Sequence, residues 1–333
     1  MPVSVAHTNE HFKTAAFSPS ATHILATTPS AISASALSKN SGKSTVTMDV
    51  WDSQWYPGMS LTASDGSWCY LACIPAFPLR LFAISPDPLN KVNVRCTYQT
   101  KNQYYDPISP YVARFNLDAS KIYCAMPREI QIFNVNSSYC TASFNTKEKS
   151  RVSDLAFARH VVAVSTYAGA ILLYDTDGAG AAINSIVPAV AVDGSVASGV
   201  TQSSFCADGF TLITTSRNSN LISTYDLRML ESPLLHIVYT EGPPTNQRIG
   251  FDVTKCGGYV AIGGTDGVVR VFRVNDGAIV STLNVGGVIG SVSFNPLNNM
   301  ELAIATGTRH FGPDDDNEEL LRGGNVMIYT LNN

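Results

Sequence analysis

The sequence predicts an all-β chain that folds as a seven-bladed WD40-type β-propeller, closed by an N-terminal strand. Two observations lead to this fold class. The 333 residues are 45% hydrophobic and only 14% charged, which is typical of a globular protein with a large core. Short runs of β-branched and aromatic residues also recur at intervals of 41 to 57 residues, at or just above the roughly 40–45 residues of one four-stranded blade.

Each repeat is marked by a run that stands where a WD dipeptide would end the third strand of a blade. Six such runs are Leu81–Ala83, Ile132–Asn134, Leu173–Asp175, Thr224–Asp226, Val271–Arg273 and Ile328–Thr330. One interval before the first run, we interpret Ala15–Pro19 and Ile24–Ala26 as the first strands of a degenerate first unit. The repeats therefore predict seven blades.

Within a unit, three strands precede an outer fourth strand. The expected first to third strands are Tyr111–Asn116, Lys121–Ala125 and Ile130–Val135 in one unit, Arg248–Val253, Tyr259–Gly263 and Val268–Val274 in another, and Ser291–Pro296, Leu302–Gly307 and Val326–Tyr329 in the last. Outer strands are expected at Leu234–Tyr239 and Ile279–Asn284.

The last unit has no outer strand of its own, so Val3–Ala6 is expected to fill that place. Pairing of the two chain ends would remove the exposed edge of an open propeller. We therefore expect one domain over residues 1–333, with residues 1–8 as the ring-closing strand and residues 308–324 as an acidic loop insertion in the last blade. Two β-sandwiches, the alternative arrangement, fit the regular spacing poorly.

Motifs that resemble catalytic or cofactor sites are incomplete, so we expect no enzyme, no cofactor and no metal. Ser41–Thr45 holds the Gly-Lys-Ser end of a P-loop, but Leu37 stands where the first Gly is required, and a connecting loop is the better interpretation. Asp314–Glu319 resembles half a calcium loop, but Glu319 occupies the Gly position of the turn. The six histidines lack metal-ligand spacing, and no residue stands in a nucleophile motif.

The chain is expected in the nucleus or cytosol, as a monomer with no membrane association. Its first residues lack the basic start and apolar core of a signal peptide, and no stretch approaches the roughly 18 apolar residues of a membrane span. The seven cysteines are odd in number and include no Cys-x-x-Cys pair, so we interpret them as buried, reduced thiols.

A net charge of −4 means that binding to RNA would need a local basic surface. In a propeller, the loops from a fourth strand to the next first strand, and from a second to a third, share one end, here called the basic end. Its expected residues are Arg80, Arg128, Lys147, Lys149, Arg151, Arg217, Arg248 and Arg309, interleaved with Phe77, Asn218, Gln247 and His310. The opposite end collects Asp65, Asp118, Asp177, Asp208 and Asp276, with Lys121 and Lys255 as exceptions. Such a surface suits phosphates and unpaired bases, whereas the alternative is that these charges only keep the protein soluble.

Four groups of residues have an order and spacing that match one family across residues 50–320. They are Trp55–Ser60 with Cys69–Ala72, Tyr225–Arg228, Thr245–Ile249 with Phe251 and Asp252, and Thr306–Arg309 with Phe311–Pro313. In these segments the chain resembles the telomerase Cajal body protein family of WD-repeat proteins. The resemblance implies an RNA-binding adapter that recognises loops of box H/ACA small Cajal-body RNA or telomerase RNA. It also implies box H/ACA ribonucleoprotein proteins as partners and a nuclear location, in Cajal bodies or an equivalent.

The residues expected to contact RNA combine this resemblance with the loop assignment. Arg248 and Arg309 are the main candidates, and Gln247 would supply hydrogen bonds to base edges. Arg217, Arg128 and Arg80 complete the set at the basic end. Arg228 lies at the opposite end, where we expect it to bond to a neighbouring blade. The alternative function is a protein–protein scaffold, in small nuclear RNA or splicing biology, whose propeller binds peptides and not RNA.

Overall fold

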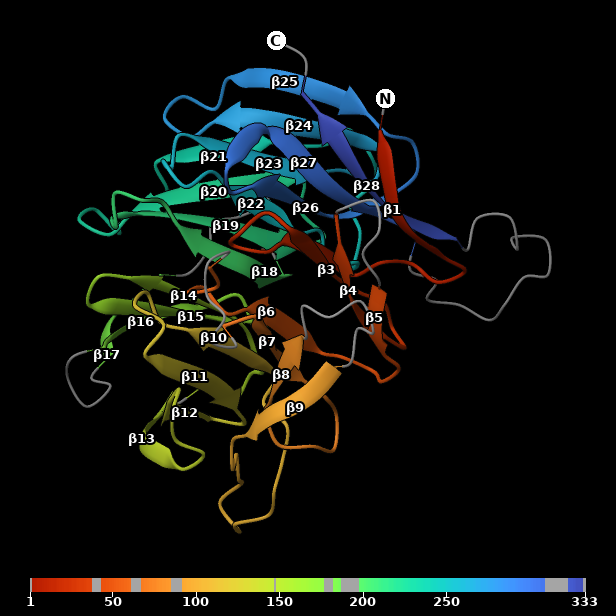
Figure 1. The fold of residues 1–333 in the computed structure, drawn as a ribbon. Coiled ribbons are helices and arrows are strands. Elements are labelled where there is room, and N and C mark those ends of the chain that lie inside the picture. The colour runs from red at the N-terminus through yellow and green to blue at the C-terminus, as the bar shows by residue number, and fades with distance from the viewer. Residues whose placement is uncertain are drawn as a thin grey trace.

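Seven four-stranded antiparallel sheets make up the computed structural model, which describes residues 2–37, 43–60, 67–84, 92–146, 148–176, 182–186, 198–308 and 323–331. The sheets follow one another around a ring in chain order (Figure 1). In blades 1 to 6 the strands of each sheet are also hydrogen-bonded in chain order, from the inner to the outer strand. The predicted seven-bladed propeller is therefore confirmed.

The strands have the following bounds. Blades 1 to 3 comprise β2 (Thr14–Phe17), β3 (His23–Thr27), β4 (Ile32–Ala36) and β5 (Lys43–Val46); β6 (Asp52–Trp55), β7 (Cys69–Cys73), β8 (Arg80–Ile84) and β9 (Val92–Thr97); and β10 (Val112–Phe115), β11 (Lys121–Met126), β12 (Glu129–Asn134) and β13 (Cys140–Asn145). Blades 4 and 5 comprise β14 (Val152–Ala158), β15 (Val161–Thr166), β16 (Ile171–Asp175) and β17 (Ala182–Ile186); and β18 (Ser198–Phe205), β19 (Thr211–Arg217), β20 (Leu221–Asp226) and β21 (Leu235–Val238). Blades 6 and 7 comprise β22 (Phe251–Val253), β23 (Tyr259–Gly263), β24 (Val268–Arg273) and β25 (Ile279–Asn284); and β26 (Ile289–Asn295), β27 (Asn298–Thr306) and β28 (Gly324–Thr330), with β1 (Val3–Thr8) outermost.

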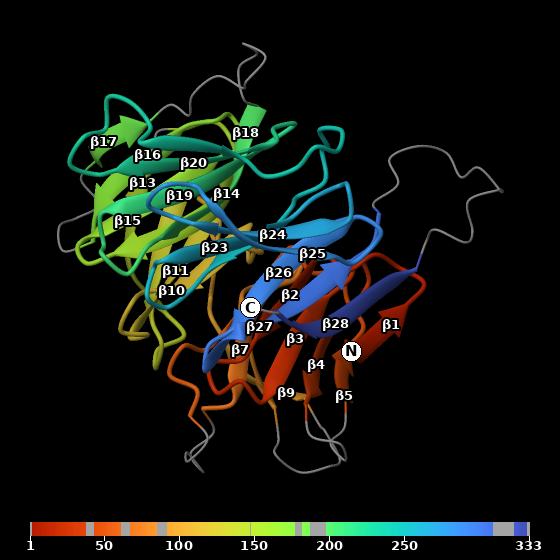
Figure 2. The same cartoon turned by 90° about the horizontal axis from the view of Figure 1, so that it is seen from above.

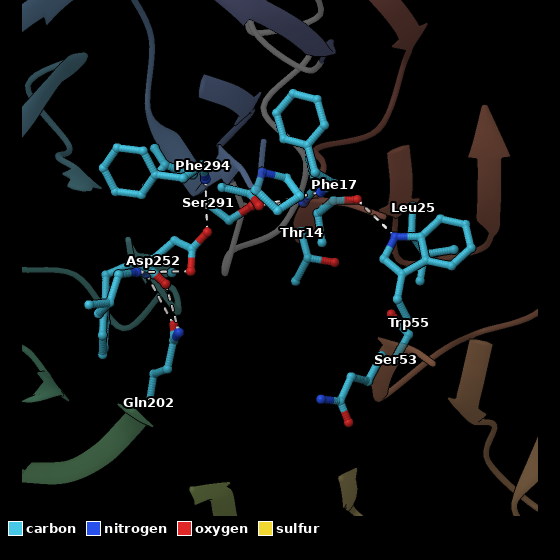
Figure 3. Close-up of a pocket in the computed structure, with 18 of the residues that line it drawn as sticks. Thr14, Phe17, Leu25, Ser53, Trp55, Gln202, Asp252, Ser291 and Phe294 are labelled. Carbon is cyan, nitrogen blue, oxygen red and sulfur yellow. Dashed lines mark hydrogen bonds between the residues drawn. The ribbon is translucent and has the colours of Figure 1, made fainter. Parts of the chain in front are cut away.

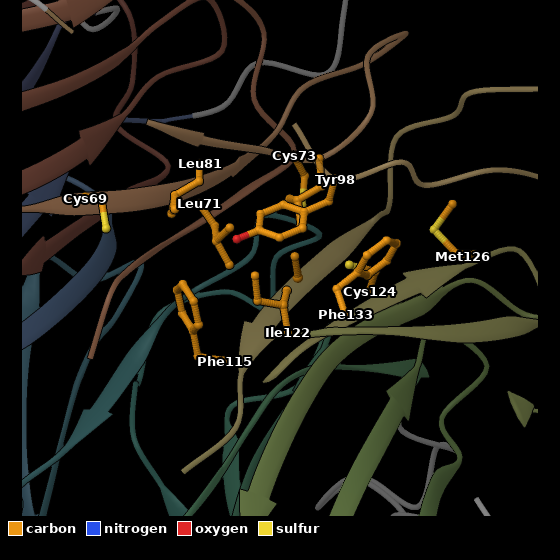
Figure 4. Close-up of a cluster of buried hydrophobic side chains, with 12 residues drawn as sticks. Cys69, Leu71, Cys73, Leu81, Tyr98, Phe115, Ile122, Cys124, Met126 and Phe133 are labelled. Carbon is orange, nitrogen blue, oxygen red and sulfur yellow. The ribbon is translucent and has the colours of Figure 1, made fainter. Parts of the chain in front are cut away.

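The core lies between neighbouring blades, which explains the sequence pattern of the strands. Every residue of β7 is buried, because blades cover both faces of this strand and select a continuous apolar run. In the cluster between blades 2 and 3, Leu71 and Leu81 pack with Ile122 (Figure 4). Outer strands such as β25 alternate between exposed and half-buried residues, since only one of their faces is covered.

The two ends of the described chain meet in blade 7. Strand β1 pairs antiparallel with β28, from Val3 opposite Ile328 to Thr8 opposite Gly324. Ala6, at the middle of β1, is buried in the adjoining core. Both ribbon views show the two strands side by side (Figures 1 and 2). The prediction of an N-terminal closing strand is confirmed.

The interpretation of Ser41–Thr45 as a connecting loop is wrong for its second half. Lys43–Val46 forms β5, the outer strand of blade 1, and Ser44 pairs with Ala34. The Ser44 side chain is buried while Lys43 and Thr45 are exposed, so the segment alternates as a strand does. Ser44, a small hydroxyl residue, takes the buried position between exposed polar neighbours, so the segment resembles a loop in the sequence.

The first strand of blade 6 begins at Phe251, three residues after the predicted start at Arg248. Gly250 instead donates its N–H to Gly290 O at 2.8 Å and forms a parallel bridge with Ser291 of the next blade. A contact between blades therefore replaces the expected pairing within the blade. Asp314–Glu319 and most of the predicted 308–324 insertion lie outside the described residues.

All seven cysteines are free, but not all are buried as predicted. Cys140 opens the outer strand β13, and Cys256 lies in the turn between β22 and β23, and both are exposed. Burial raises the pKa of the Cys69 thiol to about 11 and that of Cys206 to about 12. By contrast, a hydrogen bond with the Thr254 hydroxyl lowers the pKa of Cys256.

Candidate nucleic-acid interface

The inner strands surround a central cavity of about 520 Å³. Figure 3 shows side chains from several blades around it, including Thr14, Trp55 and Gln202. Ser53, Asp252 and Ser291 are further polar residues labelled there. Because blades 1, 2, 3, 5, 6 and 7 all contribute residues to its wall, residues far apart in the sequence meet at this cavity.

Many polar side chains in the cavity wall bond to the backbone of another blade. Gln54 Oε1 accepts the Phe115 N–H at 2.9 Å, and Ser291 Oγ accepts the Ala15 N–H at 2.8 Å. Inner strands have no fifth strand to pair with, so these side chains satisfy backbone groups that would otherwise lack a partner. We assign these residues to the stability of the ring and not to ligand binding.

A buried ion-pair network joins three blades near the cavity. Arg114 on β10 donates to Asp52 on β6 and, at 2.9 Å, to Asp154 on β14. Burial alone would lower the pKa of the Arg114 guanidinium, but the two carboxylates together raise it. Asp154 Oδ2 also accepts the Ser203 N–H at 3.1 Å, which extends the network to blade 5.

Asp252 behaves differently, because it forms no ion pair with any cation that the structure describes. Its Oδ2 accepts the Phe294 N–H at 2.8 Å and its Oδ1 accepts the Val253 N–H at 2.9 Å. Burial nevertheless dominates and raises the pKa of the carboxyl from 3.8 to about 6. Asp252 therefore titrates in the mildly acidic range.

Arg248 lines the cavity at the basic end. Its side chain is 30% exposed, and its Nη2 lies 3.8 Å from Asp154 Oδ2, so the pairing is loose. The adjacent Gln247 is buried, and its Nε2 donates to Gly307 O at 3.0 Å. The loop that carries Arg248 therefore contacts the segment that leads toward Arg309. Arg309 itself lies outside the described residues.

The other three predicted arginines are spread over the basic end and do not join Arg248. The Arg80 guanidinium lies 4.1 Å from the centre of the Phe77 ring, and its Nε is buried with no hydrogen-bond partner. Arg128 is exposed in the turn between β11 and β12, beside a cleft of about 590 Å³. Arg217 lies 4.2 Å from the centre of the Tyr167 ring.

Sequence reasoning missed the aromatic side chains that gather at this end. Trp51 and Tyr111 precede the first strands of blades 2 and 3, and Tyr167 follows the second strand of blade 4. The Arg151 guanidinium lies 5.0 Å from the Trp51 ring, 4.2 Å from Tyr111 and 6.0 Å from Tyr167. Strand order assigns each loop to one end of the propeller, and this is how the arginines were placed. The same assignment would have placed these three aromatic residues at the basic end.

The separation of charge between the two ends is less complete than the sequence suggested. Among the described residues, carboxylates also occur in loops of the basic end, and they are Glu10, Asp49, Asp106, Glu148, Glu241 and Asp266. The opposite end likewise carries the arginines Arg159, Arg228 and Arg273. The basic end holds ion pairs of its own, Lys13 with Asp49 and Arg270 with Asp266. At the opposite end, two of the three arginines are ion-paired.

Those ion pairs are local. Arg273 pairs with Asp276 at 2.7 Å, and Arg228 holds Asp226 in a two-pronged contact with a shortest distance of 2.6 Å. The expectation that Arg228 bonds to a neighbouring blade is therefore wrong, since both residues belong to the end of β20 and its turn. Hydrogen bonds from Arg228 lower the pKa of Asp226 to about 2.

At the basic end, by contrast, Arg80, Arg128 and Arg151 form no ion pair within the described residues.

No group of three or more histidine, cysteine or carboxylate side chains among all the residues that the structure describes could hold a metal ion.

No family model matches the chain. It is 26% identical over 291 residues to telomerase Cajal body protein 1 of Homo sapiens, covering 81% of this chain and 50% of that protein. It is 25% identical over 301 residues to the protein of the same name from Mesocricetus auratus, covering 85% of this chain and 52% of that protein. Over 125 residues it is 34% identical to guanine nucleotide-binding protein negative regulator 1 of Schizosaccharomyces pombe, covering 36% of this chain and 30% of that protein. The chain thus spans about half the length of the first two relatives and less of the third.

Two solved structures share the fold. Raptor of Chaetomium thermophilum superimposes with a TM-score of 0.74 at 15% identity, over 100% of this chain and 29% of that one. A chain of the mitotic checkpoint complex superimposes with a TM-score of 0.56 at 18% identity, over 72% of this chain and 67% of that one. At these identities the likeness supports the propeller and no particular function.

Proposed function

We propose that this chain is a non-catalytic RNA-binding adapter that recognises loops of box H/ACA small Cajal-body RNA or telomerase RNA and directs the ribonucleoprotein to nuclear bodies. The observation that carries the proposal is the state of the arginines at the basic end. Arg80 and Arg151 lie over aromatic rings and have no ion pair within the described residues. Their charge therefore remains available for an anionic ligand.

The similarity to the telomerase Cajal body proteins supports this choice of ligand over other anions. It extends over 81% of the chain in the human case, so it includes loops of most blades and not one motif alone. RNA that contains unpaired loops offers both phosphates and bases, and arginines beside aromatic rings can contact both.

Arg248 and Arg309 are proposed to contact the RNA, Arg248 at the central cavity. Arg248 is only loosely paired with Asp154, so a phosphate could compete for its guanidinium. In the present arrangement the Gln247 amide nitrogen holds the Arg248 loop against Gly307. The contact of Gln247 with a base edge stays a prediction, as do the RNA contacts of Arg217, Arg128 and Arg80.

An adapter also needs a surface for proteins, and the opposite end offers one. Large apolar side chains are exposed in its loops, among them Leu117 at 63%, Met229 at 69% and Leu297 at 67%. A contiguous apolar patch is typical of a site for a protein partner, whereas single exposed apolar residues are common, so these residues of blades 3, 5 and 7 are candidate contacts only. We propose that box H/ACA ribonucleoprotein proteins bind here to a monomeric propeller. If the chain bound only proteins, as a scaffold, this end and not the basic end would carry its function.

A salt titration of RNA binding tests the proposal. Affinity for a box H/ACA RNA should fall as salt rises, by about 0.7 log unit per log unit of salt for each single-strand phosphate contact. The double variant Arg248→Ala with Arg309→Ala should weaken binding by on the order of 2 kcal/mol and flatten this slope.

The matched control is Arg159→Ala with Arg273→Ala, which removes the same charge from the opposite end. It should leave RNA affinity almost unchanged. Equal losses in the two double variants would show that binding follows net charge alone. An absence of RNA binding, together with capture of box H/ACA proteins, would favour the scaffold function instead.

A further inference from the structure

The aromatic and guanidinium groups of the basic end form one continuous array, here called the ladder. It consists of Trp51, Tyr111, Arg151, Tyr167 and Arg217. Arg151 stands at its centre, in contact with all three aromatic rings. The Trp51 and Tyr111 rings lie 5.5 Å apart, and Arg217 extends the array beyond Tyr167 with its guanidinium at 4.2 Å from that ring.

The ladder crosses several blades. Trp51 precedes β6 of blade 2, Tyr111 precedes β10 of blade 3 and Arg151 precedes β14 of blade 4. Tyr167 follows β15, and Arg217 is the last residue of β19 in blade 5. Every member thus comes from a loop or strand end at the basic end, and the array follows the ring from blade 2 to blade 5.

The ladder differs from a structural core cluster in its exposure. Trp51 is 37% exposed, whereas Trp55, only four residues later, is 5% exposed and donates its indole N–H to Ala16 O. Arg151 is exposed as well, and it forms no ion pair within the described residues. Aromatic surface and an uncompensated charge are therefore presented to solvent together, which adds little to the stability of a fold.

We propose that the ladder is a stacking platform for a short run of unpaired nucleotides. This inference rests on the proposed function and deepens it, because it specifies the single-stranded part of the RNA as the ligand. Bases would stack on the exposed Trp51 ring and on the guanidinium plane of Arg151, while guanidinium N–H groups contact phosphates. Ladder contacts of 5.0, 6.0 and 4.2 Å in succession set an upper limit on the length of the ladder. That limit corresponds to about four nucleotides at about 3.4 Å each in a stacked strand.

Stacking and charge make separable predictions. Removal of an aromatic ring should weaken binding without changing the number of phosphate contacts, so the salt dependence should stay the same. Arg151→Lys keeps the positive charge but loses the planar group. If Arg151 contributes a stacking plane, the lysine variant should therefore bind almost as weakly as Arg151→Ala.

The experiment uses the full chain and fluorescein-labelled RNA hairpins whose loops hold about eight unpaired nucleotides. This length lies within the roughly 4–16 nucleotides that single-strand-binding domains with aromatic stacking surfaces occupy. A fully paired RNA duplex is the second probe. Trp51→Ala and Tyr167→Ala should each weaken hairpin binding by about tenfold. Tyr167→Phe should retain it, because the ring survives. Hairpin RNA should also quench tryptophan fluorescence. Trp51→Phe should abolish most of the quenching, since Trp55 is buried and the half-buried Trp68 lies just before β7, at the opposite end.

The chain provides a matched control at its opposite end. Phe210 is also 37% exposed and lies 4.9 Å from the Arg228 guanidinium and 5.9 Å from that of Arg159. Phe210→Ala should leave hairpin affinity unchanged, and melting temperatures of all variants exclude misfolding as the cause of a loss.

The outcomes separate the two proposals. Unchanged hairpin affinity in Trp51→Ala and Tyr167→Ala would overturn the ladder and leave RNA binding by other arginines standing. Equal affinity for hairpin and duplex would overturn it as well. If the unmodified chain binds neither RNA, the proposed function fails, and the ladder inference fails with it.

Discussion

Replacement of Arg114 by methionine tests the idea that one buried cation holds three blades together. Arg114 donates to Asp52 and Asp154, and the side chains of the three residues are 16%, 7% and 4% exposed in that order. Methionine fills a similar volume but removes the charge. Two carboxylates would then remain buried close to each other with no cation between them.

The expected loss follows from what each carboxylate retains. Breaking a buried ion pair by removing one partner typically costs about 3–5 kcal/mol. Asp154 keeps the Ser203 N–H and the loosely placed Arg248, and Asp52 keeps the Ala113 N–H. These remaining bonds reduce the penalty, so we expect a loss of about 3–4 kcal/mol in the free energy of unfolding.

Urea denaturation followed by far-ultraviolet circular dichroism measures this loss. Arg270→Met is the matched control, since Arg270 is 14% exposed and pairs with a single carboxylate, Asp266, at 2.8 Å. Addition of Asp52→Asn and Asp154→Asn to Arg114→Met should recover a large part of the lost stability. The reasoning is refuted if Arg114→Met is no more destabilising than Arg270→Met, or if the asparagines recover nothing.

Two further predictions concern the ring and its axis. Deletion of residues 1–8 removes β1 and exposes the edge of β28, so the melting temperature should fall by about 5 °C or more. An unchanged melting temperature in differential scanning calorimetry would contradict the closure of the ring by β1. Because the pKa of Asp252 is raised to about 6, the folded state binds this proton more tightly than the unfolded state does. The free energy of unfolding should therefore fall as pH rises from about 4 to about 6, by up to about 3 kcal/mol, and Asp252→Asn should show a flatter profile in urea titrations over that range.

The propeller was predictable from the sequence because its signals are local. The continuous apolar run of β23, the partial alternation of β24 and the spacing of the runs that end at Arg273 and Thr330 depend only on nearby residues. Where a strand is defined by a distant partner, prediction fails. Gly250 leaves the first strand of blade 6 because it bonds to Gly290 of blade 7, and nothing near Gly250 signals this contact.

The candidate site was predictable only in part, for a similar reason. Strand order alone fixes which end each loop occupies, so Arg217 and Arg248 could be placed at the basic end. Which side chains touch is a different matter. Arg151 meets Trp51 across 100 residues of sequence, and this contact depends on how blades 2 and 4 tilt around the axis. The same is true of Gln247, whose burial against Gly307 was not foreseen.

The pairing of β1 with β28 also means that blade 7 is completed late in synthesis. Strand β1 leaves the ribosome first among the strands, and its partner emerges roughly 300 residues later, which takes about 15–60 s at 5–20 residues per second. During that interval blades 1 to 6 can each pair their own strands, but blade 7 cannot be completed. The nascent chain therefore carries an open, adhesive edge for most of its translation, and cells that make this protein quickly would need to shield it from neighbouring ribosomes.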